Sequence, residues 1–283
     1  MRSPRSREPL RVRAPATTAN LGAGFDCAAV ALDLWNELEV SPLEQAPDLA
    51  PDPDHLGVRA FARVASPEGL AFRWTSRIPR ERGLGSSAAV IALGLVAASL
   101  LEQNRADPEE LFAHGRELEG HGDNLAAALA GGVCLTWEDR IVRVADAPPA
   151  VPIAVVPETT VSTAAARAAL PESVPHADAA FSAGRATLLG AALASGSEEL
   201  FAAALEDRLH EPYRATSVPL LGAIRGELPA GALGATLSGS GPTVIVWARE
   251  GDAAACAAEL EARFPAERVL LLRATASGTE RAS

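Results

Sequence analysis

Apolar residues recur along the chain with both the helical and the strand period. Residues 35–40 alternate polar and apolar side chains, as a half-buried strand does, and residues 86–103 form an alanine-rich run that predicts a helix. The expected strands are 10–12, 35–40, 70–75, 133–137, 141–144, 153–156, 235–237, 243–247 and 269–272. The expected helices are 55–64, 86–103, 107–119, a short helix that ends at Gly131, 162–170, two or three over 177–228, and 252–264.

Strands and helices mix in this order without strict alternation. An α+β fold is therefore favoured over a doubly wound parallel sheet. A segment rich in proline and alanine, 146–152, separates two halves and predicts domains 1–150 and 151–283.

Two helix starts carry local signals. Asp54 is the expected N-cap of the helix at 55–64. Asp107 followed by Pro108 combines an N-cap with proline at the first helical position. Both signals depend on neighbouring residues alone.

The 283 residues are 48% hydrophobic and 22% charged, a composition of folded globular domains rather than of a disordered chain. The longest nearly apolar run, 88–101, is shorter than the roughly 20 residues of a membrane span, so we expect a buried helix and no membrane contact. The net charge of −11, without a basic stripe, argues against a nucleic-acid partner. Three dispersed cysteines suit a reducing compartment, and we expect a cytoplasmic protein.

All 25 basic residues are arginine. A P-loop needs its Gly-Lys-Ser/Thr sequence, a pyridoxal enzyme needs a Schiff-base lysine, and a protein kinase of the common type needs a lysine on a strand. The inventory excludes all three classes.

Residues 83–88, Gly-Leu-Gly-Ser-Ser-Ala, open the long alanine-rich helix. Glycines let the backbone approach a phosphate, and a helix N-terminus offers free N–H groups with partial positive charge. Serine hydroxyls bind phosphate oxygens or Mg²⁺, so the segment predicts a triphosphate site, although an ordinary glycine loop with a serine N-cap has the same residues. A dinucleotide fingerprint is a further alternative, but it needs a strand running into the first glycine, and residues 79–82 intervene.

Three other polar segments are candidates. Residues 119–124, Glu-Gly-His-Gly-Asp-Asn, suit Mg²⁺ and a polar substrate or, alternatively, plain helix capping. Residues 17–26 form a glycine-bearing turn after a strand, either a ligand loop or a turn that serves only the backbone. Residues 237–243 contain Ser-Gly-Ser-Gly-Pro before a strand, either an anion-binding nest or a simple turn.

In this order and spacing, the segments resemble the GHMP superfamily of small-molecule kinases, and within it the homoserine kinase family. Residues 15–26 are similar to the family's first motif, approximately Pro-x-Thr/Ser-x-Asn-Leu-Gly-x-Gly-Phe-Asp, and residues 79–88 to its Pro-x-x-x-Gly-Leu-Gly-Ser-Ser-Ala loop. Residues 119–124 resemble its Glu-Gly-His-x-Asp-Asn segment. In the second half, residues 161–171 resemble Ser-Thr-Ala-x-Ala-Arg-x-x-Leu-Pro and residues 211–214 resemble Glu-Pro-x-Arg.

The resemblance covers about residues 10–275. It implies a two-domain GHMP kinase fold, with an N-terminal domain like ribosomal protein S5 and a ferredoxin-like C-terminal domain. It implies ATP:L-homoserine O-phosphotransferase activity, in which the γ-phosphoryl group of Mg²⁺-ATP passes to the side-chain hydroxyl of L-homoserine on the route to threonine. The partner is then a small molecule, and a homodimer rests on family analogy alone.

The resemblance also assigns residues. The nucleotide-binding positions are Pro79, Arg80, Arg82, Gly83, Leu84, Gly85, Ser86, Ser87, Ala88 and Ala89. The substrate-binding positions are Asn20, Asp26, His121, Asp123, Thr163, Arg167 and Arg214. The catalytic positions are Asn20, Asn124 and Arg214, and the metal ligands are Glu119 and Ser87, with Ser86 as the alternative to Ser87.

Homoserine is a zwitterion with a distant hydroxyl, which suits these assignments. A carboxylate pairs best with arginine in a bidentate contact, the part that Arg167 and Arg214 would take. Asp26 and Asp123 would serve the ammonium group. Asn124 stands where other superfamily members often have an aspartate base, and an amide cannot take a proton. The resemblance therefore implies catalysis by alignment, Mg²⁺ and the helix dipole, without a dedicated side-chain base.

Two rival functions are weighed. A GHMP kinase for a mevalonate-type alcohol would leave Arg167 and Arg214 without substrate contact. A non-catalytic nucleotide sensor on the same fold would have lost the metal ligand or the substrate residues, whereas Glu119, both serines and both arginines are present.

Overall fold

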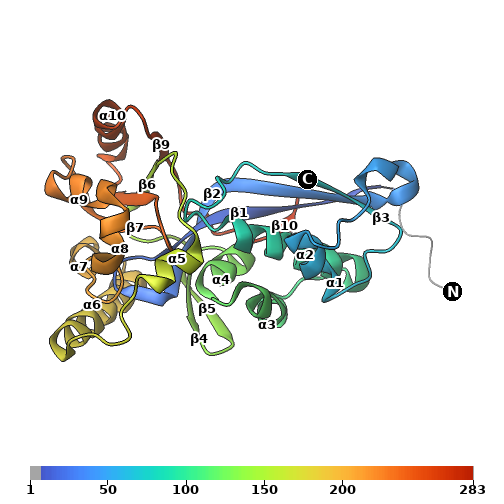
Figure 1. The fold of residues 1–283 in the computed structure, drawn as a ribbon, viewed down its shortest axis with the longest axis horizontal. Helices are drawn as coiled ribbons and strands as arrows, with labels where there is room; N and C mark the ends of the chain where they lie inside the picture. The colour runs from blue at the N-terminus through green and yellow to red at the C-terminus, as the bar shows by residue number, and fades with distance from the viewer. Residues whose placement is uncertain (1–7, 283) are drawn as a thin grey trace.

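The computed structural model describes residues 8–282. The molecule is elongated, with two antiparallel sheets toward its opposite ends (Figure 1). The first sheet has the order β10-β1-β2-β4-β5, with β3 paired to β2, and the second has the order β7-β8-β6-β9. The mixture of helices and antiparallel strands is the α+β class expected from the sequence.

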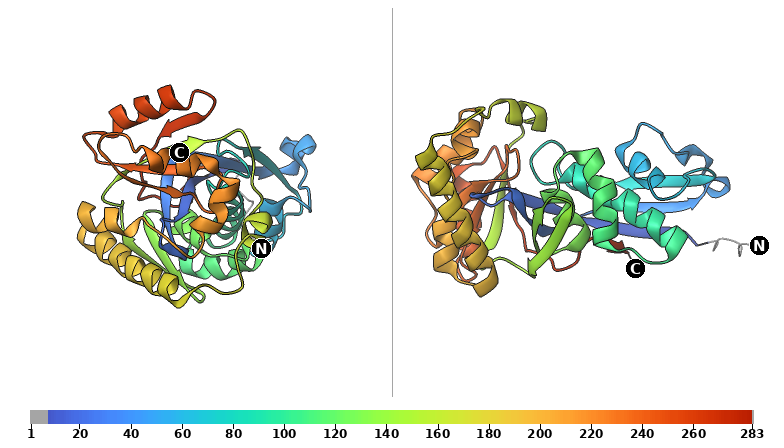
Figure 2. Two further views of the ribbon diagram at one scale, coloured as in Figure 1. Left: turned by 60° about the vertical axis from the view of Figure 1, so that its left-hand side comes forward. Right: turned by 90° about the horizontal axis from the view of Figure 1, so that it is seen from below.

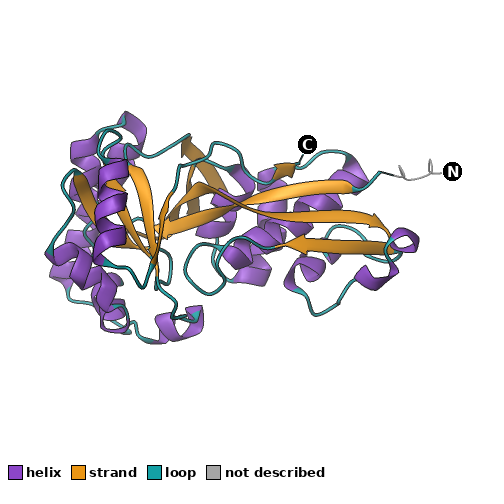
Figure 3. Cartoon of the chain, turned by 90° about the horizontal axis from the view of Figure 1, so that it is seen from above, coloured by secondary structure: helices purple, strands orange, loops and turns teal. Residues whose placement is uncertain are grey.

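A long hairpin forms the frame of the first sheet and runs far along the molecule (Figure 3). Residues 14–24, around its turn, are all buried. Successive side chains of a strand point to opposite faces, so both faces of the hairpin are covered there. The strands of this sheet are β1 (Leu10–Asn20), β2 (Gly24–Pro42), β3 (Leu70–Thr75), β4 (Val133–Trp137), β5 (Arg140–Ala145) and β10 (Glu280–Arg281).

Helices from the first half of the chain pack along the first sheet (Figure 1). They are α1 (Leu56–Ala62), α2 (Ser86–Gln103), α3 (Pro108–Glu119) and α4 (Asp123–Ala130). Within residues 8–282, α2 is the single helix long and apolar enough to cross a membrane, yet 61% of that stretch is buried inside the fold. A helix that is apolar all round belongs in a core, and α2 lies in this one.

The second sheet has helices on both faces, which are gathered at one end of the molecule (Figure 2). On β6, Ile153 and Val155 pack into a core with α9 and α10, whereas Ala154 and Val156 join the main core with α6 and α7. Two covered faces explain why β6 is an unbroken apolar run. The elements are β6 (Val151–Val156), α5 (Thr163–Ala168), α6 (His176–Ser195), α7 (Glu198–Ala204), α8 (Glu211–Arg214), α9 (Pro219–Gly226), β7 (Ala232–Leu237), β8 (Val244–Ala248), α10 (Ala253–Arg263) and β9 (Arg268–Leu271).

The strand order of the second sheet is that of a ferredoxin-like βαββαβ unit. β6 and β7 flank the first helical crossover, β7 and β8 form a hairpin, and α10 leads to β9. The expectation of a ferredoxin-like C-terminal half is confirmed.

Several local expectations were wrong. The first strands are much longer than predicted, because residues of β1 and β2 with both faces buried show no polar alternation. The N-cap of α1 is His55, whose Nδ1 accepts from the Gly57 N–H at 3.2 Å, and not Asp54. Four helices, rather than two or three, occupy 176–226.

The end of the chain returns to the first sheet. The Asp33 N–H donates to the Arg273 carbonyl (2.8 Å), and the Gly132 N–H donates to the Thr275 carbonyl (2.7 Å). β10 then pairs with β1, where Val12 faces Arg281. The division near residue 150 stays a prediction: the second sheet begins at Val151, and residues 273–282 lie against the first.

Candidate active site

A cavity of about 480 Å³ is lined by residues from both halves of the chain. Its walls are the β1–β2 turn, the start of α2, the α3–α4 junction, the start of α5, α8, and the loop between β7 and β8. The sequence-predicted residues that line it are Asn20, Asp26, Arg80, Gly83, Gly85, Ser86, Ser87, Glu119, His121, Asp123, Asn124, Thr163, Arg167 and Arg214. Outside its lining lie Pro79, Arg82, Leu84, Ala88 and Ala89.

The start of α2 has the geometry of an anion site. Gly83 and Gly85 have φ of +76° and +66°, in the left-handed region that glycine adopts without strain. A Cβ at Gly85 would overlap Thr17 Oγ1, so this position also needs glycine for space. The first turn of α2 contains no acidic residue, and its free N–H groups face no competing carboxylate from their own helix.

Arg82 holds the loop in place rather than lining the cavity. Its Nε donates to the Pro157 carbonyl (2.8 Å) and its Nη2 to the Glu158 carbonyl (2.5 Å). The Val161 N–H donates to the Glu81 carbonyl at 3.3 Å. These bonds join the glycine loop to the segment that follows β6 in the second half.

Glu119 and Ser87 form the part of the wall that suits a cation. Ser87 Oγ donates to Glu119 Oε1 at 2.6 Å, whereas Oε2 is buried without a hydrogen-bond partner among the described residues. Burial raises the pKa of Glu119 to about 7. Residues 8–282 hold no group of three or more His, Cys, Asp and Glu side chains placed to bind a metal. Mg²⁺ needs only one or two carboxylates beside phosphate and water oxygens, so the orphaned oxygen and the hydroxyl fit it.

Asp123 and Asn124, at the start of α4, are engaged with each other and with β1. Asp123 Oδ1 accepts from the Asn124 N–H (2.7 Å) and from Asn124 Nδ2 (3.2 Å). Asn124 Oδ1 accepts from Thr17 Oγ1 at 2.7 Å. Burial raises the pKa of Asp123. On the preceding loop, His121 Nδ1 lies 3.2 Å from the Glu119 carbonyl oxygen.

Arg214 is a buried cation without an anionic partner in the described chain. It is 4% exposed, and the hydrogen-bond partners of its guanidinium among the described residues are all neutral: the carbonyls of Ala166 (3.4 Å) and Gly239 (3.2 Å) and the ring of His210 (3.2 Å). Burial, and then the nearby Arg167, lower the pKa of Arg214. An unpaired buried charge is costly, so this corner of the cavity favours an anion.

A second arginine stands beside it in an ion pair. Arg167 Nη2 lies 2.6 Å from Asp26 Oδ1, and both side chains are about one-third exposed, at 33% and 39%. Arg167 Nε is buried without a partner among the described residues. The Phe25 ring lies between the two cations, 5.8 Å from the Arg167 guanidinium carbon and 5.2 Å from that of Arg214. Thr163, the first residue of α5, is exposed at the rim.

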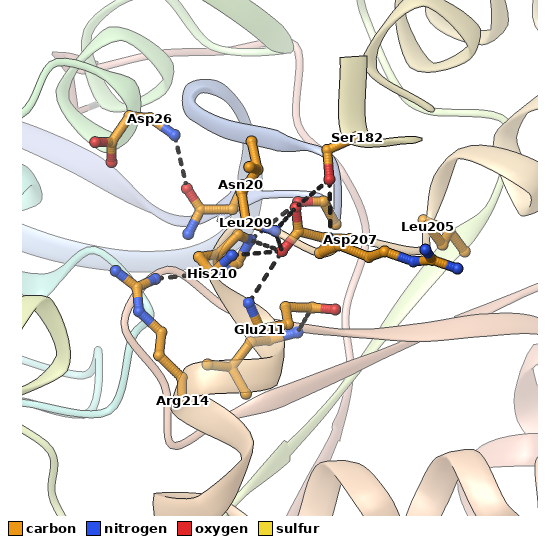
Figure 4. Close-up of polar contacts among 12 residues, drawn as sticks. Asn20, Asp26, Ser182, Leu205, Asp207, Leu209, His210, Glu211 and Arg214 are labelled. Atoms are coloured by element: carbon orange, nitrogen blue, oxygen red, sulfur yellow. Dashed lines mark hydrogen bonds and ion pairs between the residues drawn. The ribbon is translucent and has the colours of Figure 1, made fainter. Parts of the chain in front are cut away.

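Asn20 occupies a left-handed conformation, with φ of +74°. Its Oδ1 accepts from the Asp26 N–H (3.0 Å), and its Nδ2 donates to the Gly239 carbonyl (2.9 Å), as Figure 4 shows in part. Left-handed residues are rare outside glycine and cluster at functional turns. The polar turn predicted at 17–26 is therefore the tip of the β1–β2 hairpin, stabilised by its own asparagine.

Sequence reasoning did not assign eight of the lining residues: His55, Leu56, Glu81, Val90, Val161, Ser162, Gly239 and Ser240. The Ser238–Thr243 segment was noted, but none of its residues was assigned, although Gly239 and Ser240 line the cavity. A hydrogen bond from Ser238 Oγ to the Gly83 carbonyl oxygen (2.6 Å) holds this segment against the glycine loop. His55, Leu56 and Val90 line the cavity at the glycine-loop end without any sequence signal. Glu211, by contrast, serves the fold, since Arg225 and the Leu237 N–H bind its carboxylate.

Comparison with known proteins places this chain among close relatives. The family profile "GHMP kinases N terminal domain" matches residues 55–132, and "GHMP kinases C terminal" matches residues 181–266. A homoserine kinase of Streptomyces avermitilis is 41% identical over 86% of this chain and 87% of its own length. The crystal structure of homoserine kinase from Cytophaga hutchinsonii is 25% identical and covers 100% of both chains with a TM-score of 0.87. A mevalonate kinase of Methanococcus jannaschii has a TM-score of 0.69 at 14% identity, covering 95% of this chain and 99% of its own, and shares the fold alone.

Proposed function

This chain belongs to the GHMP kinase family, and from that premise we propose that it phosphorylates the side-chain hydroxyl of L-homoserine with ATP. The product is O-phospho-L-homoserine, an intermediate of threonine biosynthesis. Relatives at 41% identity over most of the chain are homoserine kinases, whereas the mevalonate kinase is similar only in fold.

The observation that carries the substrate is the charge pattern at one end of the cavity. Arg214 is buried without a carboxylate partner among the described residues, and the Arg167–Asp26 ion pair lies beside it. A small zwitterion satisfies both features, because its carboxylate faces the two guanidiniums and its ammonium faces Asp26 and Asp123. Mevalonate has no ammonium group and would bring no cation to Asp26 and Asp123.

The opposite end suits a triphosphate. The N–H groups of the glycine loop and of the first turn of α2 can donate to phosphate oxygens, and Ser86 is a further hydroxyl on this wall. Glu119 and Ser87 are the residues that would hold Mg²⁺. Bound there, Mg²⁺ would neutralise charge on the β- and γ-phosphate oxygens.

Transfer then depends on alignment. The substrate hydroxyl oxygen forms a bond to the γ-phosphorus, the bond from that phosphorus to the β,γ-bridging oxygen breaks, and ADP leaves. Asn124 cannot take the hydroxyl proton, and its amide is occupied by Thr17 and Asp123. The proton passes to solvent or phosphate oxygen, and the rate depends on positioning and charge stabilisation.

Three finer points belong to the same proposal. Mg²⁺ is the proposed metal, since the donor set is one carboxylate and one hydroxyl. The cytoplasm is the proposed location, since Cys27, Cys134 and Cys256 are all unpaired thiols. A homodimer is proposed by family analogy alone, and light scattering of the purified protein tests it.

The test is an ADP-release assay with Mg²⁺-ATP and a panel of acceptors: L-homoserine, D-homoserine, L-threonine, mevalonate and no acceptor. We expect turnover with L-homoserine alone, and its loss in the Arg214→Ala variant. Turnover with mevalonate would contradict the substrate assignment. ADP release that is equal with and without acceptor would also contradict the assignment of L-homoserine as the substrate, while leaving the fold and the phosphate loop in place.

A further inference from the structure

His210 lies directly before α8 and is fully buried, at 0% exposure. Its Nδ1 is 3.2 Å from Arg214 Nη1 (Figure 4). Its Nε2 is 3.0 Å from the Gly22 carbonyl oxygen. The imidazole therefore bridges the β1–β2 turn and the guanidinium that faces the cavity.

The two neighbours determine the tautomer of the ring. A guanidinium can only donate and a carbonyl oxygen can only accept, so Nδ1 is the acceptor and Nε2 carries the hydrogen. The ring is then neutral. Burial lowers the pKa of His210 to about 4, against the opposing effect of Asp207, which agrees with a neutral ring at neutral pH.

The surroundings hold the ring rigidly. Phe25 stacks on it with centroids 4.8 Å apart and planes 18° apart. Asp207 Oδ2 accepts from the backbone N–H groups of His210 (2.7 Å) and Glu211 (3.0 Å). Ser182 Oγ donates to Asp207 Oδ1 at 3.2 Å. The backbone, one ring face and both ring nitrogens are thus all engaged.

We propose that His210 is a positioning residue that orients Arg214 toward the substrate's carboxylate. The inference rests on the proposed function, because the carboxylate is that of L-homoserine. Without the Nδ1 acceptor, Nη1 keeps only the Gly239 carbonyl, and the buried guanidinium turns toward other acceptors.

Two substitutions separate the contacts of the ring. In His210→Asn, the amide oxygen replaces Nδ1 and keeps the acceptor for Arg214 while the donor to Gly22 is lost. In His210→Gln, the amide nitrogen replaces Nε2 and keeps the donor to Gly22 while the acceptor is lost. If the His210 ring only fills space, the smaller Asn side chain should reduce activity more than the Gln side chain does.

We expect His210→Gln to raise the KM for L-homoserine roughly 10- to 100-fold, the usual cost of losing a hydrogen bond to a charged group. His210→Asn stays within about threefold of wild type, and the KM for ATP changes less than about twofold in both variants. With 3-aminopropan-1-ol, which is homoserine without its carboxylate, neither variant differs from wild type. Ser99→Ala is the matched control, because its buried hydroxyl loses a bond to the Arg105 carbonyl (2.7 Å) near the C-terminal end of α2, away from His210 and Arg214.

Equal effects of the Asn and Gln variants, or equal effects on 3-aminopropan-1-ol, overturn the proposal. A wild-type protein that does not phosphorylate L-homoserine overturns the proposed function instead, so the two failures are distinct. The ¹⁵N shifts of the His210 ring in the wild-type protein give a test that needs no variant to fold. A neutral ring with hydrogen on Nε2 at pH 7 is expected, and an Nδ1–H or doubly protonated ring contradicts the proposal.

Discussion

Asn20 and Arg214 donate to the same acceptor, the carbonyl oxygen of Gly239, at 2.9 and 3.2 Å. Asn20 is the last residue of β1, and Arg214 is the last residue of α8 in the second half of the chain. The loop between β7 and β8 is therefore the shared support of both, and any change that moves it displaces two walls of the cavity together.

Asp26→Asn tests the proposed ammonium site. Asparagine tolerates the left-handed conformation that Asp26 adopts, with φ of +57°, so the turn is expected to persist. Loss of the charge should raise the KM for L-homoserine about 10- to 100-fold. Turnover of 4-hydroxybutanoate, which is homoserine without its amino group, should not fall, because this acceptor has no ammonium group for Asp26 to bind. Equal losses with the two acceptors, measured by ADP release, would show that Asp26 acts only on the fold.

Glu119→Gln should stabilise the metal-free protein while it reduces activity. The pKa of Glu119 is raised from 4.5 to about 7, so above pH 4.5 the unfolded state loses its proton first and unfolding becomes more favourable. Glutamine removes that cost, and the stability gain should grow from pH 4.5 to about 7 and then level off at no more than about 3 kcal/mol.

Denaturant unfolding of the metal-free protein at several pH values measures the gain. Glu117→Gln is the matched control, since Glu117 lies on the same helix in an exposed pair with Arg63. A gain that is constant with pH would contradict the buried, proton-bound state of Glu119.

Removal of divalent metal should abolish turnover. In a wild-type preparation treated with a chelator, activity should return on addition of Mg²⁺, because one carboxylate with phosphate oxygens suits this ion. The Mg²⁺ concentration for half-maximal rate should rise at least about tenfold in Glu119→Gln, by loss of the charged ligand. Full activity in the chelator-treated protein, checked for residual metal, would exclude a role for the ion.

Gly85→Ala tests the glycine loop. The left-handed conformation costs a non-glycine residue about 1–2 kcal/mol, and the new Cβ would overlap Thr17 Oγ1. We expect the free energy of unfolding to fall by about 2 kcal/mol or more and kcat/KM to fall about 100-fold.

Gly184→Ala gives the opposite expectation and serves as the control. Gly184 lies within α6 with open space around its Cα, so alanine should stabilise the protein by about 0.5–1 kcal/mol without affecting turnover. Thermal unfolding and ADP release measure both variants. Equal behaviour of the two would contradict the steric argument for Gly85.

Much of the local structure could be predicted from short segments. Helix α2 spans the predicted residues 86–103, and α3 begins after Asp107, whose side chain accepts from the Glu109 N–H at 3.0 Å. Capping and helical period depend on residues within one or two turns, which is why these predictions are correct. Where the cap is a histidine, as at His55, the preference for aspartate led to the wrong residue.

The long hairpin and the last strand could not be predicted in the same way. β2 runs from Gly24 to Pro42 because β1 pairs with nearly its whole length while β3 and β4 pair with separate stretches of it, and β10 is a strand only through its pairing with β1. Pairing between distant segments leaves no periodic signal when both faces of a strand are buried.

The sequence by itself determined which chemical groups are available: a glycine loop before an apolar helix, acids and amides at a helix junction, and arginine as the only strong cation. The tertiary structure decided how they act. It buries Arg214 beside a neutral His210, leaves Glu119 Oε2 without a hydrogen-bond partner within residues 8–282, and pairs Asp26 with Arg167. Charge state and pairing depend on burial and on neighbours far away along the chain, and only the folded arrangement supplies those.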